Sequence, residues 1–195
     1  MSTLFSVGQM NQLGDALEAA GFTPDDVTHL RSFTKGLGLV RDVLDGYAKI
    51  VKIPQVIDLD AEPYVPNTFG LAWEVREHIK GGQFEWDPAQ VELYVSEQQH
   101  YGKIKGNLLR KELKHKVFNA NLLDWLLENP RLIPDGWKGK NVLFWGTLYH
   151  YSHGGRLFVR SLLYYGVNHG WGSGFRGLSN SFDVHCPAVV PAGGS

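Results

Sequence analysis

The sequence contains one cysteine, Cys186, in 195 residues. A single thiol excludes an internal disulfide and any metal site or redox pair that requires two cysteines. The chain also lacks an excess of either charge, since 19 Lys and Arg side chains stand against 20 Asp and Glu. A chain so close to neutrality has no overall field that would attract nucleic acid or an anionic membrane surface. We therefore expect no nucleic-acid partner.

Long hydrophobic runs are absent as well. No apolar stretch approaches the length of a bilayer span, and residues 1–11 lack the basic start and apolar core of a signal peptide. We expect no membrane span and, by default, a cytoplasmic location, although a virion component would have the same features. The final Gly193-Gly194-Ser195 is typical of an appended linker and is left out of the fold prediction.

Four residue types disappear partway along the chain. Lys, Glu, Gln and Met occupy 29 of the first 140 positions and none of residues 141–195, which also lack Ile. At the earlier frequency about 11 of the four types would be expected in the last 55 residues. This break separates two compositional regimes, and the functional prediction depends on it.

Residues 1–52 are predicted to form short helices. Met10, Leu13, Leu17 and Ala20 have the spacing of an apolar stripe, and Gly21 ends the segment. Thr23-Pro24-Asp25-Asp26 is typical of a helix start, with a hydroxyl cap, an early proline and two carboxylates at the positive end of the helix dipole. The later helices are expected to bury two further stripes: Val27, Leu30 and Phe33, then Leu37, Val40, Leu44, Tyr47 and Val51. Five basic and six acidic side chains in this segment disfavour DNA binding.

The rest of the chain is predicted to contain strands and two further helices. Residues 53–83 carry three prolines and little periodicity, which predicts an irregular connector with short extended pieces. Residues 91–95 alternate as a strand does, residues 107–116 and 122–127 have helical patterns, and residues 142–145 and 157–160 resemble strands joined across a turn at 152–155. Residues 188–190 are predicted to be a last strand. The fold class is therefore α+β, with a helical segment (1–52), a connector (53–83) and a C-terminal domain (84–192).

Catalytic signals are weak. Cys186 follows His185, but neighbours in an extended segment point to opposite sides and are poorly placed for proton transfer. His150 and His153 flank the predicted turn without a third ligand at a recognisable spacing. We predict no catalytic residue, metal or cofactor. One alternative remains a metalloenzyme that uses His150, His153 or His185, and another is a structural subunit of a phage or mobile element.

Residues 161–186 have the composition of a recognition surface or of an aromatic- and glycine-rich β region that only packs, and composition alone does not separate the two. Thirteen of the 26 residues are Ser, Tyr, Gly or Asn. Rigid aromatic side chains supply contact area at low entropic cost, while small polar residues adapt their hydrogen bonds. Moreover, Lys, Glu, Gln, Met and Trp are the residues that no codon ending in a pyrimidine specifies, and residues 172–186 contain none of them. Randomising the first two bases of codons such as AAC would produce this restricted alphabet.

Several motifs of the C-terminal half, in their order, carry a family resemblance. They are Leu132-Ile133-Pro134-Asp135-Gly136-Trp137-Lys138-Gly139-Lys140, Phe144-Trp145-Gly146-Thr147, Arg156-Leu157-Phe158-Val159-Arg160 and Pro187-Ala188-Val189-Val190. With these motifs, residues 84–192 resemble the variable proteins of diversity-generating retroelements, in particular those of small-genome bacteria and their mobile elements. The resemblance implies a C-type lectin fold whose last strands and loops present exchangeable side chains to a protein or surface ligand. It implies neither sugar nor calcium binding, and the lone cysteine departs from the paired cysteines of formylglycine-generating enzymes, which share the fold.

The resemblance and the composition together predict the ligand-binding residues. Tyr164, Tyr165, Trp171 and Phe175 are the expected aromatic anchors. The other predicted contact residues are Asn168, His169, Ser173, Arg176, Ser179, Asn180, Ser181, Asp183, His185 and Cys186. Leu178, Phe182, Pro187 and Ala188 are expected to hold the scaffold. The predicted function is non-catalytic recognition of a variable ligand.

Overall fold

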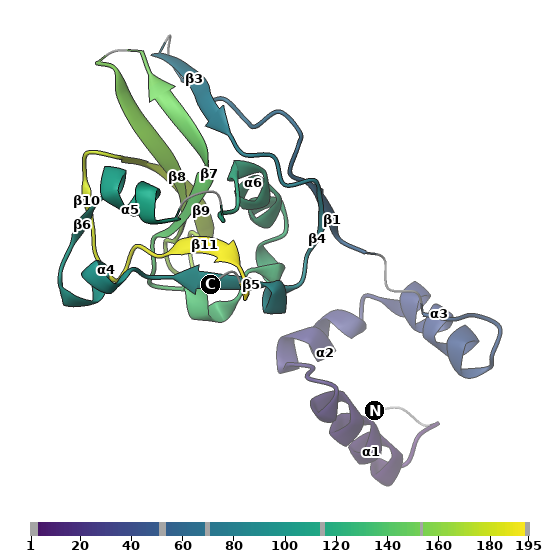
Figure 1. Ribbon diagram of the computed structural model, residues 1–195. Coiled ribbons are helices and arrows are strands. Elements are labelled where there is room, and N and C mark those ends of the chain that lie inside the picture. Colours follow the sequence, from purple (N-terminus) through teal and green to yellow (C-terminus); the bar gives the residue numbers. More distant parts are fainter. Residues whose placement is uncertain (1–3, 51–53, 69–70, 114–115, 153, 194–195) are drawn as a thin grey trace. The chain divides into compact units, whose positions relative to one another are not determined.

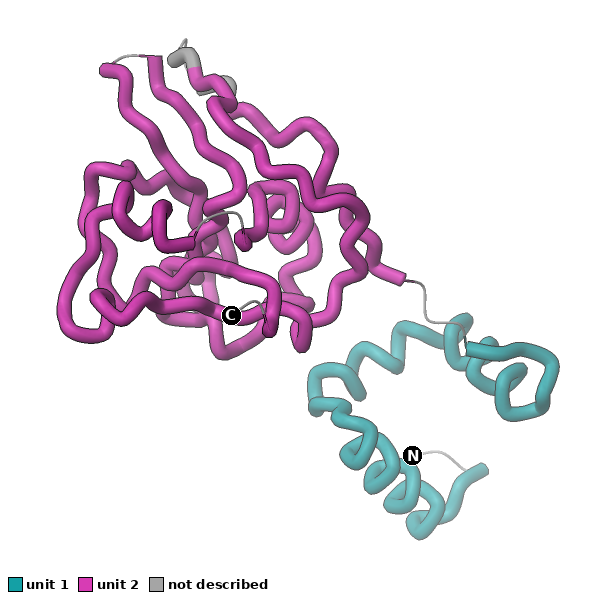
Figure 2. The backbone as a smooth tube through the Cα atoms, in the orientation of Figure 1, with its two compact units in different colours: residues 1–53 teal, residues 54–195 magenta. Residues whose placement is uncertain are grey.

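The computed structural model describes residues 4–50, 54–68, 71–113, 116–152 and 154–193. The chain divides into two compact units, residues 1–53 and residues 54–195 (Figure 2). The second unit therefore includes nearly all of the segment that the sequence predicts to be a connector. Among the described residues, no helix combines the length and the hydropathy that a membrane span requires.

The first unit contains three helices, α1 (Val7–Ala19), α2 (Pro24–Leu30) and α3 (Thr34–Leu44) (Figure 1). The predicted helix-end signals are confirmed. The Thr23 hydroxyl accepts a hydrogen bond from the Asp26 amide at 3.3 Å, the Asp26 carboxylate accepts one from the Thr23 amide at 2.9 Å, and Gly21 has a φ of 82°. Such caps satisfy backbone groups that the helix itself leaves unpaired.

The predicted burial of the apolar stripes in this unit is wrong. Met10, Val27, Phe33, Leu37 and Val40 are all exposed, and Gly36 is the only buried residue of the three helices. Local signals are enough to define helix ends, but burial requires that two apolar surfaces pack together, and the three described helices do not pack their apolar residues on one another.

The second unit is built on a mixed β-sheet. Its strands are β1 (Val56–Asp58), β2 (Asn67–Thr68), β3 (Leu71–His78), β4 (Gln83–Glu85), β5 (Val91–Tyr94), β6 (Ile104–Lys105), β7 (Val142–Tyr151), β8 (Arg156–Tyr164), β9 (Trp171–Gly177), β10 (Ser181–Phe182) and β11 (Ala188–Pro191). Strand β7 is central: β8 pairs along one edge, while β3 and β11 pair with opposite ends of the other. The sheet continues through β2, β5 and β9, and β1–β4 and β6–β10 form two small separate ladders. The predicted class, a mixed α and β protein, is confirmed at this level.

Helices pack on both faces of β7. The helices of this unit are α4 (Glu97–Tyr101), α5 (Gly106–Leu113) and α6 (Ala120–Glu128), with short 3-10 helices at Pro88–Gln90, Pro130–Leu132 and Asp135–Trp137. Val142 and Phe144 belong to a core cluster that includes the leucines of α6, whereas Leu143 and Trp145 belong to a second cluster that includes those of α5. Successive side chains of a strand point to opposite faces, so burial on both faces explains why β7 reads as a continuous apolar run.

The predicted connector contains short extended pieces, β1 and β2, but also the eight-residue strand β3, which was not predicted. Its three prolines all precede β3, and β3 then pairs with β7 over five registered positions between Trp73 and His78. The prolines favoured the prediction of an irregular segment, and the strand that follows them was therefore not predicted. This strand has a functional consequence, because it brings Trp73 to the face of the sheet described below.

Candidate recognition surface

Most of the predicted contact residues lie on and after strand β9. This strand runs antiparallel to β8, with Trp171 opposite Tyr164, Ser173 opposite Leu162 and Phe175 opposite Arg160. Among the described strands it pairs only with β8 and so forms an edge of the sheet. The sequence analysis found no regular period here, because glycines at every second or third position interrupt the alternation by which a strand is recognised.

The predicted residues are distributed over the surface, and none of the fourteen is fully buried. Nine are exposed: Tyr165, Asn168, His169, Ser173, Arg176, Ser179, Asn180, Ser181 and His185. Five are half-buried: Tyr164, Trp171, Phe175, Asp183 and Cys186. By contrast, the four expected scaffold residues, Leu178, Phe182, Pro187 and Ala188, are buried.

The set does not gather at one point. Trp171, Ser173 and Phe175 share one face of β9, and Arg176 lies on the other. Ser181 belongs to β10, where it pairs with Lys105 of β6, and the Lys105 ammonium donates to the Ser179 carbonyl at 3.3 Å. The segment therefore presents at least two patches, one on β9 and one beside β6.

Phe175 lies in an aromatic cluster that also contains residues from outside the predicted segment. Its ring stacks on Trp73 at 4.4 Å between centroids and meets Tyr149 edge-on at 5.4 Å. Trp73 in turn contacts Tyr151 and Phe158. Trp73, Tyr151 and Phe158 are half-buried, so together with Phe175 they form a partly open aromatic patch. Trp73, Tyr151 and Phe158 were not predicted from the sequence. The only signal for β3 was the spacing of apolar side chains by two within residues 73–77.

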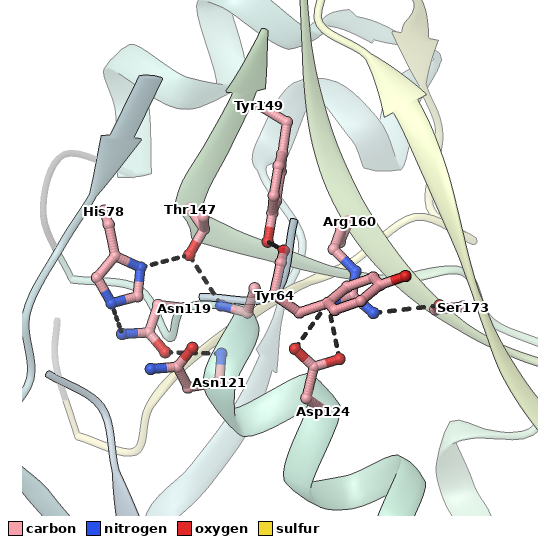
Figure 3. Close-up of polar contacts among 10 residues, drawn as sticks. Tyr64, His78, Asn119, Asn121, Asp124, Thr147, Tyr149, Arg160 and Ser173 are labelled. Carbon is pink, nitrogen blue, oxygen red and sulfur yellow. Dashed lines mark hydrogen bonds and ion pairs between the residues drawn. The ribbon is translucent and has the colours of Figure 1, made fainter. Parts of the chain in front are cut away.

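A buried ion pair supports the same face of β9. Arg160 is 3% exposed, and its guanidinium lies 2.7 Å from one Asp124 carboxylate oxygen and 2.8 Å from the other (Figure 3). Arg160 also donates to the Ser173 hydroxyl at 3.3 Å, and its guanidinium lies 5.5 Å from the centre of the Tyr64 ring. Burial raises the pKa of Asp124 above its ordinary value, and the charge on Arg160 opposes that shift. The arrangement fixes β8 to α6 directly beneath a predicted contact residue.

A pocket of about 600 Å³ adjoins this ion pair. Its walls include Tyr64, Asp124, Trp125 and Arg160, with the carboxylate of Glu128 close by. Residues of α6 and of the segment around β1 thus provide a hollow that has both apolar and charged walls and includes Arg160 of β8. The sequence analysis did not predict it, because its walls come from segments that are far apart in the chain.

The opposite face of β9 carries a second polar group. The Asn141 side chain, oriented with its amide nitrogen toward Ser161, donates to that hydroxyl at 2.9 Å and accepts from the Arg176 guanidinium. Cys186 is nearby, since Arg176 and Asp183 both influence its thiol. Burial, reinforced by the Asp183 charge, raises the pKa of this thiol, which favours its protonated form at neutral pH.

Two of the three histidines of the enzyme alternative, His150 and His185, lie in the described residues and belong to different segments. The His150 Nδ1 atom lies 2.7 Å from a Glu74 carboxylate oxygen, while His185 is exposed on another segment. His153 lies outside the described residues. Within the described ranges, no group of three or more His, Cys, Asp or Glu side chains could hold a metal ion.

Comparisons of the chain with protein-family models, with curated proteins and with solved structures found no significant match.

Proposed function

We propose that the chain is a non-catalytic ligand-binding display protein, with a C-type-lectin-like domain whose segment 161–186 is a recognition surface diversified by a retroelement. One observation carries the proposal. In residues 172–186, which use the restricted codon alphabet, most of the predicted contact residues are exposed, Ser173, Arg176 and Asn180 among them. Leu178 and Phe182, which were expected to hold the scaffold, lie in the core. Surface side chains can vary without cost to the fold, whereas core side chains cannot.

The framework beneath the segment favours such a role. Strand β8 is held between β7 and β9 and is tied to α6 by the Arg160–Asp124 pair. Strands β5 and β11, from the two ends of the predicted 84–192 domain, pair with each other. A rigid frame of this kind keeps the backbone in place while the side chains on its surface change.

The ligand class that fits is a protein or another macromolecular surface. The aromatic patch around Phe175 offers rigid apolar contact area on the same face of β9 as Ser173, and Ser179, Asn180 and Ser181 offer short polar groups in the separate patch beside β6. This combination of aromatic anchors and small polar residues is the one that antibody-like surfaces use for protein ligands.

Sequencing of the gene from many cells of one population tests the diversification. We expect substitutions to concentrate at the codons of the exposed positions between 161 and 186, and a near-copy of this coding segment to lie beside a reverse-transcriptase gene. Substitutions spread evenly along the gene, or an invariant segment 161–186, would contradict the proposal. Stoichiometric metal in the purified protein, lost on changing His150, His153 or His185 to Ala, would favour the metalloenzyme instead.

A matched pair of variants tests whether the frame tolerates variation. Asn180→Tyr changes an exposed side chain and is expected to alter the free energy of unfolding by less than about 0.5 kcal/mol. Phe182→Ala, two residues away, removes a side chain that is 1% exposed and is expected to cost about 3–5 kcal/mol. Urea denaturation followed by tryptophan fluorescence measures both. Equal losses for the two variants would mean that the segment is structural throughout.

A further inference from the structure

The helices of the first unit leave an unusually large apolar surface uncovered. Of the 23 large hydrophobic side chains that are exposed in the described residues, 14 lie between Leu4 and Ile50, although this unit is much the shorter of the two. On α1 the exposed apolar residues are Val7, Met10 and Leu13, and on α3 they are Leu37, Leu39, Val40 and Leu44. Exposed apolar surface in this concentration marks an interaction site.

The charges of the unit are divided between its two halves. Residues 7–30, which comprise α1 and α2, carry the four carboxylates Asp15, Glu18, Asp25 and Asp26 and no Lys or Arg. Residues 31–50, which include α3, carry Arg31, Lys35, Arg41 and Lys49 against Asp42 and Asp45. The first half therefore has a formal charge of −4 and the second half a formal charge of +2.

We propose that the first unit is a self-association module, in which the acidic α1–α2 half of one chain packs on the basic α3 half of a second copy. A two-fold symmetric interface contains each contact twice. The acidic half of each copy can therefore face the basic half of the other, and halves of like charge stay apart. The two halves do not cover each other within one chain, because Gly36 is the only buried residue of the three described helices. The apolar stripes provide the buried area, and the charges set the register and orientation.

Self-association goes beyond the proposed recognition function and does not depend on it. Its consequence for any surface-binding role is avidity, since two copies joined through their first units would present two recognition surfaces to one target.

Sedimentation equilibrium of the full chain over a range of concentrations tests the proposal. We expect a mass of twice 21.8 kDa and an association that weakens as salt is added. The double variant Leu37→Ser/Leu44→Ser is expected to raise the dissociation constant at least about tenfold, because it removes apolar area from α3. Leu108→Ser changes a leucine of the second unit that is 50% exposed and is the matched control, with no effect expected.

Charge reversal tests the pairing of the two halves. Lys35→Glu/Arg41→Glu makes both halves acidic and is expected to dissociate the pair, as is Asp15→Lys/Glu18→Lys/Asp25→Lys, which makes both halves basic. The chain with all five changes restores opposite signs and is expected to associate again. Circular dichroism of each variant verifies that the helices persist.

A chain that stays monomeric at every concentration would overturn the proposal and assign the exposed helices to a different partner. Association that survives the Leu37/Leu44 change would overturn it as well, because the interface would then lie elsewhere. Failure of the variant with all five changes to associate would reject the pairing of acidic and basic halves.

Discussion

At the scale of single residues, burial decides which side chains of the candidate surface can change and which cannot. Ser173 and Arg160 interact directly, yet Ser173 is exposed and Arg160 is 3% exposed. Asp124 is the partner that makes the burial of a guanidinium tolerable, because an unpaired buried charge is far more costly than a paired one. The stability of the surface therefore depends on residues that lie beneath it.

Changing Asp124 to Ala is expected to cost about 3–5 kcal/mol in the free energy of unfolding, because it leaves the buried Arg160 guanidinium without a counter-charge. Asp135→Ala breaks the exposed contact between Asp135 and Lys138 and is the control, for which we expect no measurable change. Chemical denaturation measures both. A loss as small as that of the control would show that water enters and solvates Arg160.

Alkaline pH is expected to destabilise the protein through Tyr149. Burial raises the pKa of this phenol from 10.0 to about 12, so the folded state binds the phenolic proton more tightly than the unfolded state does. The resulting contribution is fully present below pH 10 and is lost as the pH rises to 12. Two pKa units correspond to about 3 kcal/mol.

Denaturation midpoints of wild type and Tyr149→Phe across this pH range measure that contribution. The variant is expected to show a shallower fall in stability between pH 10 and 12, whereas Tyr101→Phe, at a tyrosine that is 87% exposed, should behave as the wild type does. Identical pH profiles for all three proteins would refute the assignment to Tyr149.

At the scale of elements, the N-terminus of α6 is fixed to the sheet by a polar network. The Thr147 hydroxyl accepts from the Ala120 amide at 3.0 Å and lies 2.9 Å from His78 Nδ1 (Figure 3). Asn119 donates to the Leu59 carbonyl at 2.7 Å. These bonds join α6, β3 and β7. Gly146 allows this close approach, because a Cβ atom there would lie 2.9 Å from the backbone of Asn119.

Gly146→Ala is therefore expected to destabilise the protein by about 1–3 kcal/mol, since neither the strand nor the backbone of Asn119 can move away easily. Gly136→Ala is the matched control, because an added Cβ would meet nothing within 4 Å and the residue does not have a positive φ. Thermal unfolding followed by circular dichroism compares the two. A neutral Gly146→Ala would mean that β7 shifts to accommodate the methyl group.

At the scale of the whole molecule, the two units differ in how many of their hydrophobic side chains are buried. Both hydrophobic clusters are formed by residues between Ile57 and Val190, whereas the first unit contributes no residue to either. The second unit therefore contains the parts that a stable fold needs, and the described helices of the first carry apolar surface that they do not bury against one another.

A chain that begins at Pro54 is expected to fold and to keep the free energy of unfolding of the full-length protein within about 1 kcal/mol. Denaturation of both proteins at the same low concentration, followed by tryptophan fluorescence, measures this difference. Loss of cooperative unfolding in the shorter chain would mean that the N-terminal helices contribute to the core after all.

Local signals in the sequence determined much of this protein. The Thr23 cap and Gly21 define helix ends, the alternation at residues 91–94 defines a strand, and the residues around Ala188 form a last strand, because each depends on neighbours in the chain. The position of the candidate surface was also available from the sequence, since a restricted alphabet is a property of composition.

Tertiary structure alone decided the rest. Only pairing with β7 makes β3 a strand of the main sheet, and only that pairing brings Trp73 against Phe175. Arg160 and Asp124 are 36 residues apart and meet because α6 crosses the face of β8. Contacts of this kind depend on which surfaces pack together, and hydrophobic burial is non-directional, so a periodic pattern specifies that a face is apolar but not what will cover it. The uncovered stripes of the first unit follow from the same principle.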